Sequence, residues 1–501
     1  MFPMKKIHSV SRERLPFWYL AAAGLLEFLF ITMVCIPSYL GYYLAETYLI
    51  VPCLLFLGHV LQTKKSDFAR RRLVLAGAAV VWFVISQIIH KLYGMENQPI
   101  SNVLGVYLLA FPFAALTDDR ENTGLWQTGK FFLAAALVLV AYSGILLLDL
   151  VPDGWKEFLY WDGTRLNVFW HPNITACYLM IGMGFGMVFL IRAQKKLTKI
   201  LLAAAVAVQF LTMALTNCRT TLLMTGALLG GIAFFLISRG GWKRFVLGLL
   251  AAALILVGSF KLSGEIYRWN EDRIISAVSA IHAGDDSEAD TDQNAVAEEE
   301  QEEQHADAYA AAAEQEEQHA DAYIAAEEEQ LEERTADAYT AEEEKQVELA
   351  GENPQGSLVS DMASLNGRTY IWKSALQAIR DNKALALWGT EYSGTVISVY
   401  NSFPVEHSHN SWMEVLLRAG IPGLLIALIF TLLSAVRAAE LLLSSRTELW
   451  KKIIAMLTMC VMVSGFLEPY LFGGKAYYHV IDFIFLFCTG YLDFWCKEQK
   501  A

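Results

Sequence analysis

Twelve long apolar segments constrain the fold of this chain more than any other feature of its sequence. They fall near residues 16–38, 43–61, 73–90, 101–117, 130–150, 174–191, 199–216, 221–238, 245–262, 420–437, 453–472 and 478–495. A helix that crosses a hydrocarbon core of about 30 Å needs about 20 mostly apolar residues. The sequence therefore predicts an all-α integral membrane protein with about 12 transmembrane helices, one for each segment.

The composition agrees with this fold class once the charges are located. Hydrophobic residues make up 55% of the chain and charged residues 18%, which excludes an ordinary soluble enzyme with about 25% charged residues. The formal net charge is −13. Residues 285–352 alone hold 26 acidic and two basic residues, a charge of −24, so the rest of the chain carries +11. The protein is thus a basic membrane body with an acidic insert.

Basic residues gather in alternate loops between the apolar segments. The clusters include Lys5, Lys6, Arg12, Arg14, Lys64, Lys65, Arg70, Arg71, Arg72, Arg192, Lys195, Lys196, Lys199, Arg239, Lys243, Arg244, Arg437, Arg446, Lys451 and Lys452. Lys and Arg are enriched in cytoplasmic loops. We therefore expect a multi-pass protein of the bacterial cytoplasmic (inner) membrane with both termini in the cytoplasm. The outer face then receives the loop 151–173, the turn 216–220 and the long segment 263–419.

This topology divides the chain into three parts. Residues 1–262 form a membrane body with spans 1–9, residues 263–419 an extracytoplasmic segment, and residues 420–501 a membrane body with spans 10–12. In the middle part, residues 353–419 are expected to form the catalytic loop and amphipathic helices, whereas 285–352 is a low-complexity repeat.

The acidic repeat has no features of an active site. EEQHADAY occurs at 302–309 and at 316–323, and EERTADAY follows at 332–339. Its Ala, Glu and Gln residues are strong helix formers, so a polar helix and a fluctuating solvated chain are both compatible with it. His305 and His319 are better explained by solvated low-complexity sequence than by a metal site. We expect this insert to be dispensable for catalysis.

Two outer segments next to the spans contain ionisable residues. Arg219 stands in a short polar turn between two apolar segments, where an arginine can also simply reach toward the lipid headgroups. Arg165 and His171 lie in the aromatic-rich loop before the sixth span. Interfacial belts explain the tryptophans of this loop, but they do not explain Arg165.

Two more outer segments precede the tenth span. Arg368 opens a stretch in which Ile371, Trp372, Ala375, Leu376 and Ile379 recur at helical spacing, so an amphipathic helix is expected on the membrane surface. His409 precedes a second short amphipathic helix. That helix is expected to break at residues 420–423, where Gly and Pro permit a kink. A histidine just before such a kink can face a cavity, although a lone histidine is more often structural.

Three arginines and a histidine from separate outer segments favour chemistry at a diphosphate. Arginine binds phosphate oxygens with a planar, permanently charged fork. Histidine, with an ordinary pKa of about 6.5, accepts a proton near neutral pH. No nucleotide-binding loop, HExxH or GxSxG motif occurs in a suitable context, and the seven cysteines have no paired spacing. Nucleotide, redox and metal chemistry are therefore not expected.

The same segments resemble the O-antigen ligase and polysaccharide polymerase family of bacterial membrane proteins. RTYIWKSAL at 368–376 and HSHNSWMEVLLRAGIPGLL at 407–425 are similar to its signature, which has a His-Asn pair, an apolar-Glu pair and Gly-x-x-Gly. HPNITA at 171–176 and NCRTTLL at 217–223 resemble its Pro-Asn element and its arginine between two spans. ALALWGTEYSG at 384–394 keeps only part of the family's pattern, and the acidic repeat is not a family feature.

The resemblance implies a glycosyltransferase with GT-C architecture. Its donor would be a glycan on undecaprenyl diphosphate, and its acceptor a saccharide hydroxyl on a glycolipid or surface glycan at the outer face of the membrane. His409 would be the catalytic base, with His407 a less suitable substitute. The resemblance also implies inversion at the anomeric carbon without a metal or another cofactor. The residues that would bind the substrates are Arg165, Arg219, Arg368, Asn410 and His171.

Three alternatives remain open from the sequence. A polysaccharide polymerase uses the same scaffold and differs in its acceptor. A lipid or polysaccharide transporter would also have about 12 spans, but it predicts charged residues within several spans and internal repeats. In a surface scaffold, the acidic repeat would be the functional part and the membrane body an anchor. No nucleic-acid partner is expected.

Overall fold

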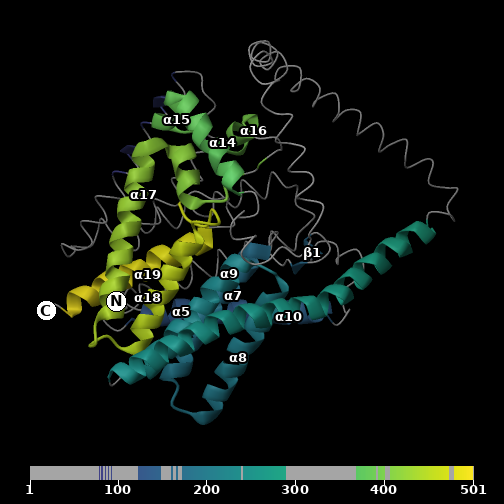
Figure 1. Cartoon of the computed structure of the whole chain (residues 1–501), viewed down its shortest axis with the longest axis vertical. Helices are drawn as coiled ribbons and strands as arrows, with labels where there is room; N and C mark the ends of the chain where they lie inside the picture. The colour runs from purple at the N-terminus through teal and green to yellow at the C-terminus, as the bar shows by residue number, and fades with distance from the viewer. Residues whose placement is uncertain are drawn as a thin grey trace, which may run out of the picture. The chain divides into compact units, whose positions relative to one another are not determined.

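The computed structural model describes the chain from the fifth predicted span onward, with gaps (Figure 1). Its described ranges are 122–147, 160–161, 165–166, 172–238, 241–288, 368–390, 393–400, 405, 407–472 and 479–499, with Ala78, Val81, Trp82, Ile85, Ile88, Ile89 and Leu92 as single helical positions. The first four predicted spans otherwise lie outside the described residues, as does the acidic repeat from 289 onward. The count of twelve spans and the GT-C architecture therefore stay predictions.

The described part is mostly helical. Its elements are α5 (Thr123–Leu147), β1 (Tyr160–Trp161), β2 (Arg165–Leu166), α7 (Pro172–Arg192), α8 (Lys196–Leu215), α9 (Arg219–Ile237), α10 (Trp242–Glu288), α14 (Arg368–Asp381), α15 (Lys383–Trp388), α16 (Ser393–Val399), α17 (Ser411–Leu443), α18 (Leu449–Ser464) and α19 (His479–Glu498). Six of these helices, α5, α7, α8, α9, α10 and α17, contain stretches long and apolar enough to cross a membrane. The described part is thus mostly helical and consistent with the all-α membrane protein that the hydropathy predicts.

Two helices differ from their predicted spans. The predicted span 453–472 is in fact α18, which has 16 residues and ends at Ser464, followed by turns through Glu468. Pro469 has no backbone N–H and ends any continuation of the helix there. The helix α10 is longer than its predicted span, with 47 residues that extend to Glu288.

The helix α7 lies at the centre of the described bundle and packs against α5, α8, α9 and α18. Glycines permit this close packing. A Cβ on Gly182 would lie 2.3 Å from the Cβ of Ala136, and one on Gly184 would lie 2.9 Å from the side chain of Leu457. Small residues at helix contacts let the backbones approach closely. In a bilayer, where the hydrophobic effect does not drive helices together, this close packing stabilises their association.

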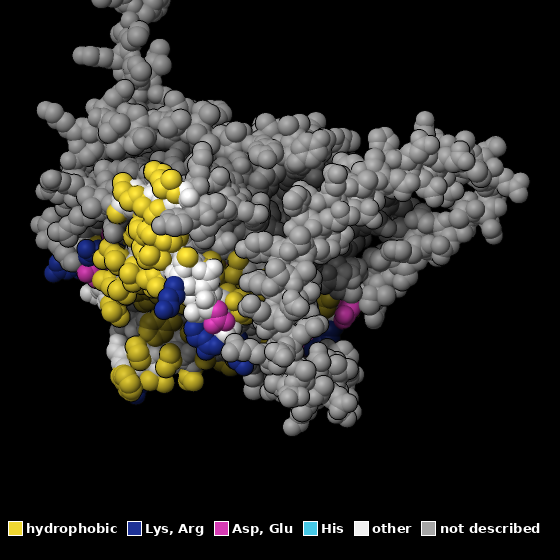
Figure 2. Space-filling view, turned by 90° about the horizontal axis from the view of Figure 1, so that it is seen from above, with side chains coloured by type: hydrophobic (Ala, Val, Ile, Leu, Met, Phe, Trp, Pro, Cys, Tyr) yellow, Lys and Arg dark blue, Asp and Glu magenta, His cyan; other side chains and the backbone are white. Residues whose placement is uncertain are grey.

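The outward faces of the bundle are apolar. Leu247, Leu250 and Leu254 of α10 are exposed, as are Leu425 and Leu432 of α17. Figure 2 shows hydrophobic side chains gathered on the described surface, with Lys and Arg side chains beside them. Side chains of this kind belong against lipid, so the pattern supports a protein embedded in a bilayer.

The two ends of the bundle differ in their residues. At one end, hydrogen bonds join the strand β2, the N-terminus of α7 and the turn after α8. At the other end, the side chains of Trp126, Arg192 and Trp450 meet. A 21-residue helix such as α7 separates these ends by about 30 Å. The loops that the charge pattern assigns to the outer face therefore meet at one end.

The helices α14, α15 and α16 form a small layer beside the first half of α17. Ile371, Ala375 and Ala378 of α14 are buried with Leu385, Ile397 and Leu417 in a separate apolar core. The amphipathic helix predicted after Arg368 is thus confirmed. Leu376 is an exception, because it is exposed rather than on the buried side.

The helix α17 has a kink at the position that its sequence predicts. Gly420 has φ 64° and ψ −174°, a conformation that is essentially restricted to glycine. The kink leaves backbone carbonyls without partners inside the helix, and these carbonyls accept hydrogen bonds from other segments. Leu417 O accepts a hydrogen bond from the backbone N–H of Thr390 at 2.7 Å, and Ala419 O accepts one from Trp82 Nε1 at 2.9 Å. The kink is therefore fixed by its neighbours.

A side chain at the kink should destabilise the protein. We expect Gly420→Ala to lower the free energy of unfolding by about 1–3 kcal/mol from the backbone conformation alone. The added Cβ would also lie 2.2 Å from Leu387 O. Thermal unfolding in detergent measures the change. Gly258→Ala is the matched control, since a Cβ there meets nothing within 4 Å, and its stability should not fall.

Candidate functional site

The turn between α8 and α9 presents a carbonyl group to the polar end of the bundle. Thr216 ends α8, and Asn217 follows in the left-handed region with φ 46°. The hydroxyl of Thr216 donates to Met213 O at 2.7 Å and accepts from the N–H of Cys218 at 3.3 Å. With the turn held in this way, Thr216 O accepts a hydrogen bond from Arg165 Nε at 3.0 Å.

Arg165 reaches this turn from a short hairpin. It is the first residue of β2, which pairs with β1 in an antiparallel register that places Arg165 opposite Trp161. Besides Thr216 O, its guanidinium contacts the amide oxygen of Asn173, with Nη2 donating at 2.9 Å. Both acceptors are uncharged, so within the described residues no carboxylate pairs with the positive charge of Arg165. Three of its five N–H groups also form no hydrogen bond with the part of the chain that the structure describes.

Asn173 joins Arg165 to a buried carboxylate. It lies one residue after Pro172, which begins α7 and suits the first position of a helix. Its Nδ2 donates to Glu468 Oε1 at 2.7 Å, and its backbone oxygen accepts from the hydroxyl of Tyr470 at 2.9 Å. These bonds connect positions that are 295 and 297 residues apart in the sequence.

Glu468 faces His409. Its side chain is 1% exposed, and Oε2 lies 3.9 Å from Nδ1 of His409, whose side chain is 29% exposed. This distance is too long for a hydrogen bond but short enough for a strong interaction with a protonated imidazole. Within the described residues, Nδ1 has no hydrogen-bond partner. His409 itself has φ 51°, a left-handed backbone that turns its ring at the entry to α17.

The turn that carries Glu468 is attached to the start of α17. Ser411 is the central residue of this attachment, because its N–H donates to Gly465 O at 2.7 Å and its hydroxyl donates to Glu468 O at 2.9 Å. Asn410 caps the helix by accepting from the N–H groups of Trp412 and Met413, and its Nδ2 donates to Phe466 O at 2.9 Å. The position of Glu468 relative to His409 is therefore fixed by several bonds.

A second buried carboxylate, Glu414, holds the loop before His409. It accepts hydrogen bonds from the backbone N–H of Ser408 at 3.1 Å and from its hydroxyl at 2.9 Å. Arg418 Nε pairs with it at 2.7 Å, and the hydroxyl of Ser393 donates to it as well. His407 is buried in this loop, with its ring edge against His409 at 4.2 Å between centroids. Glu414 thus fixes the backbone next to His409, and the ring of His407 packs against the ring of His409.

The charge of Glu468 also acts on Cys218 in the turn after α8. Burial, followed by the negative charge of Glu468, raises the pKa of the Cys218 thiol above its ordinary value. The thiol therefore stays protonated near neutral pH, and a protonated thiol is a poor nucleophile. The reactive groups at this end of the bundle are then an imidazole, guanidinium groups and carboxylates.

One family model matches part of the chain. Residues 204–428 match the model of the O-antigen ligase family, a range that contains Arg219, the kink and His409. This part of the chain is therefore similar to the O-antigen ligase family. No curated protein matches the chain. Members of this family are glycosyltransferase-like membrane enzymes of polysaccharide biosynthesis, ligases or polymerases, that act on a lipid-linked glycan and an acceptor.

Some of the predicted site residues come together in the structure. Arg165 and His409 are linked through Asn173 and Glu468. Arg219 begins α9 three residues after Thr216, and its side chain is exposed. Arg368 begins α14 and is half-buried. His171 lies outside the described residues.

Asn410 has a structural explanation that its sequence position did not indicate. Its amide oxygen caps α17 and its amide nitrogen binds Phe466 O, as described above. An N-cap of this kind contributes about 1 kcal/mol to helix stability. A contact between Asn410 and the substrate stays a prediction.

Glu468 is not among the predicted site residues, although the sequence contains a signal for it. Glu468 is the one acidic residue in the apolar segment 453–472. An ionisable residue within a predicted span is rare and often functional, so Glu468 could have been singled out on that ground. Asn173 was recognised as part of the Pro-Asn element but was not assigned a role. Nothing in the sequence pairs it with Glu468.

Proposed function

We propose that this chain transfers a glycan from undecaprenyl diphosphate to a saccharide hydroxyl at the outer face of the bacterial cytoplasmic membrane, as a ligase. The observation that carries the proposal is the link from Arg165 through Asn173 and Glu468 to His409. It connects a cation suited to a diphosphate with a base suited to a hydroxyl proton, in a family of glycosyltransferase-like enzymes.

The proposed reaction is a single displacement. The acceptor oxygen attacks the anomeric carbon of the donor, and the bond from that carbon to the diphosphate oxygen breaks. The hydroxyl proton passes to Nε2 of His409, since Nδ1 faces Glu468. One displacement inverts the anomeric carbon, and undecaprenyl diphosphate leaves with the bonding electrons.

Arginines supply the charge that the leaving group requires. Arg165, Arg219 and Arg368 are the residues that we assign to the diphosphate, and the substrate contact of His171 belongs to the same proposal. Guanidinium groups placed where negative charge develops lower the barrier because they need little rearrangement during the reaction. This arrangement requires no metal ion.

Glu468 is proposed to orient and stabilise His409 once it is protonated. The imidazolium that forms would lie 3.9 Å from Oε2, at a position where Glu468 is 1% exposed and water screens little of the interaction. Asn173 holds the other carboxylate oxygen, so Glu468 cannot turn away easily. In this proposal Asn173 positions Glu468, and Glu468 positions His409.

A reconstituted reaction tests this function. Purified full-length protein is mixed with an undecaprenyl-diphosphate oligosaccharide and a glycolipid acceptor, with and without a metal chelator. We expect glycosylated acceptor and undecaprenyl diphosphate in equal amounts, an inverted anomeric linkage, and the same rate with chelator. Retention of the anomeric configuration, or loss of activity with chelator, would contradict the mechanism.

The same reaction separates the two alternatives. A polymerase on this scaffold would lengthen the glycan with donor alone, because a second donor molecule would then serve as acceptor. A transporter would move labelled donor between leaflets of a vesicle without cleaving it. Transfer that depends on the added acceptor would exclude both.

A further inference from the structure

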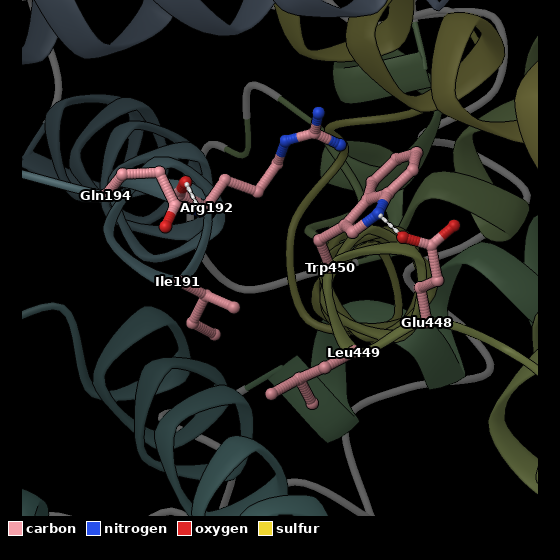
Figure 3. A pocket seen from close by; sticks show the side chains of 6 residues that line it. All are labelled: Ile191, Arg192, Gln194, Glu448, Leu449 and Trp450. Carbon is pink, nitrogen blue, oxygen red and sulfur yellow. Dashed lines mark hydrogen bonds between the residues drawn. The ribbon is translucent and has the colours of Figure 1, made fainter.

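A cavity lies at the end of the bundle opposite His409. Its volume is about 610 Å³, and it is located where α7 ends and α18 begins (Figure 3). The residues that line it are Ile191, Arg192, Gln194, Glu448, Leu449 and Trp450. The proposed transfer reaction has no use for this cavity, because α7 places it about 30 Å from Asn173.

Arg192 is the cation of this cavity. Its guanidinium carbon lies 4.3 Å from the ring centroid of Trp126 and 5.2 Å from that of Trp450, and Figure 3 shows its side chain extending toward Trp450. The two tryptophan rings are 4.8 Å apart. Stacking of this kind orients the planar group but uses its faces, so the N–H donors at its edge remain available.

No carboxylate of the described residues neutralises Arg192. Glu448 is the acidic residue of the lining, but its Oε2 accepts a hydrogen bond from Trp450 Nε1 at 2.6 Å and its Oε1 lies 3.9 Å from Lys451 Nζ. Figure 3 shows the first of these bonds. The N-terminus of α8 adds the exposed cations Lys195, Lys196 and Lys199 nearby in the sequence. The cavity is therefore set in positive surroundings and would attract an anion.

Three of the remaining lining residues are apolar, and Gln194 is polar and exposed. Leu449 is 9% exposed and Trp450 6%, and Ile191 is half-buried at the last turn of α7. Together with Arg192, these side chains combine a cation with an apolar wall at the end of membrane helices. That combination matches a lipid whose headgroup is charged and whose chains are apolar.

We propose that this cavity binds the phosphodiester headgroup of an anionic phospholipid, in the leaflet opposite the catalytic site. Arg192 contacts the phosphate oxygens, and Ile191 and Leu449 contact the first carbons of the acyl chains. Basic pockets between transmembrane helices bind anionic lipid headgroups by the same combination. The lipid would contact both α7 and α18. Asn173 lies at the other end of α7, and the other end of α18 leads into the turn with Glu468.

Binding is measured on the purified full-length protein in detergent. Phosphatidylglycerol, phosphatidylcholine or inorganic phosphate is added at matched concentrations, and retained lipid is counted by native mass spectrometry beside the thermal unfolding midpoint. We expect retention of phosphatidylglycerol and a higher midpoint with it than with phosphatidylcholine, and no change with phosphate. Equal effects of the two lipids, or an equal effect of phosphate, would overturn the proposal.

Variants test the role of Arg192. Arg192→Gln should weaken phosphatidylglycerol binding about tenfold or more, since a charged hydrogen-bond donor is lost. Arg192→Lys should lie between, because lysine keeps the charge but not the fork. Lys199→Gln, which removes one exposed cation at the same end, is the matched control and should bind within about twofold of the wild type. Wild-type binding by Arg192→Gln would refute the site.

A second variant keeps the proposal testable if Arg192→Gln does not fold. Glu448→Gln removes the one carboxylate of the lining and can still accept the bond from Trp450 Nε1. It should bind phosphatidylglycerol as well as the wild type or more tightly, because a repulsive charge is gone. Weaker binding by this variant would mean that the ligand is not an anion.

Discussion

Replacing His409 with alanine is expected to lower kcat for glycan transfer by about 10²–10⁴-fold, the range that a positioned general base contributes. The imidazole has one nitrogen, Nδ1, 3.9 Å from Glu468 Oε2, so in the proposed reaction Nε2 on the other side of the ring accepts the hydroxyl proton. The variant should still bind the donor, because the proposed diphosphate ligands are arginines. Initial rates at varied donor concentration measure kcat and KM separately.

The control for His409→Ala is Arg380→Ala. Arg380 lies in the last turn of α14, and its side chain is 73% exposed. It has no role in the proposed reaction. Its rate should stay within about twofold of the wild type, as for most exposed substitutions. A folded His409→Ala protein that transfers glycan at the wild-type rate would show that His409 is not the base.

Glu468→Gln is expected to lower kcat by about 10²-fold and to leave KM for the donor nearly unchanged. Glutamine has the size of glutamate, and its amide oxygen can still accept the hydrogen bond from Asn173 Nδ2. The fold should therefore persist, while the negative charge facing His409 is lost. Loss of one preorganised electrostatic contact typically has an effect of this size on kcat. Steady-state rates beside thermal unfolding curves measure both consequences.

Two further variants define what this result means. Glu468→Asp keeps the charge on a shorter side chain and should recover part of the rate that glutamine loses. Glu265→Gln makes the same chemical change at an exposed carboxylate of α10, 67% exposed, and should keep the wild-type rate. A Glu468→Gln protein with unchanged kcat, or one whose lost rate equals its unfolded fraction, would contradict the electrostatic role.

The helices of the described part were largely predictable from the sequence, since each span depends on its own residues. Transfer of about 20 apolar side chains from water to lipid sets the position of a helix such as α7 or α9 whatever its neighbours are. The kink at Gly420 was predictable for a similar reason, because Gly and Pro act on the local backbone. The end of α18 at Ser464 was predicted eight residues too late, since hydropathy continues through the turns that carry Glu468.

The site was predictable only in part. Arg165 is predicted because interfacial belts do not explain it, and His409 because it precedes a kink and lies in a stretch similar to the family's signature. Glu468 and Asn173 did not stand out, and their bond joins residues 295 positions apart. Such a pairing depends on which helix ends lie side by side. The hydropathy of a helix does not predict which other helices pack against it.

By itself, the sequence determined that this chain is a helical membrane protein, that its net negative charge comes from an insert, and that its polar outer segments contain arginines and a histidine. The tertiary structure decided which of these side chains meet. It placed Asn173 between Arg165 and Glu468, and it placed Glu468 beside His409. The physical reason is that burial in lipid is a sum over local residues, whereas a hydrogen-bonded site needs atoms from distant segments within about 3 Å of each other.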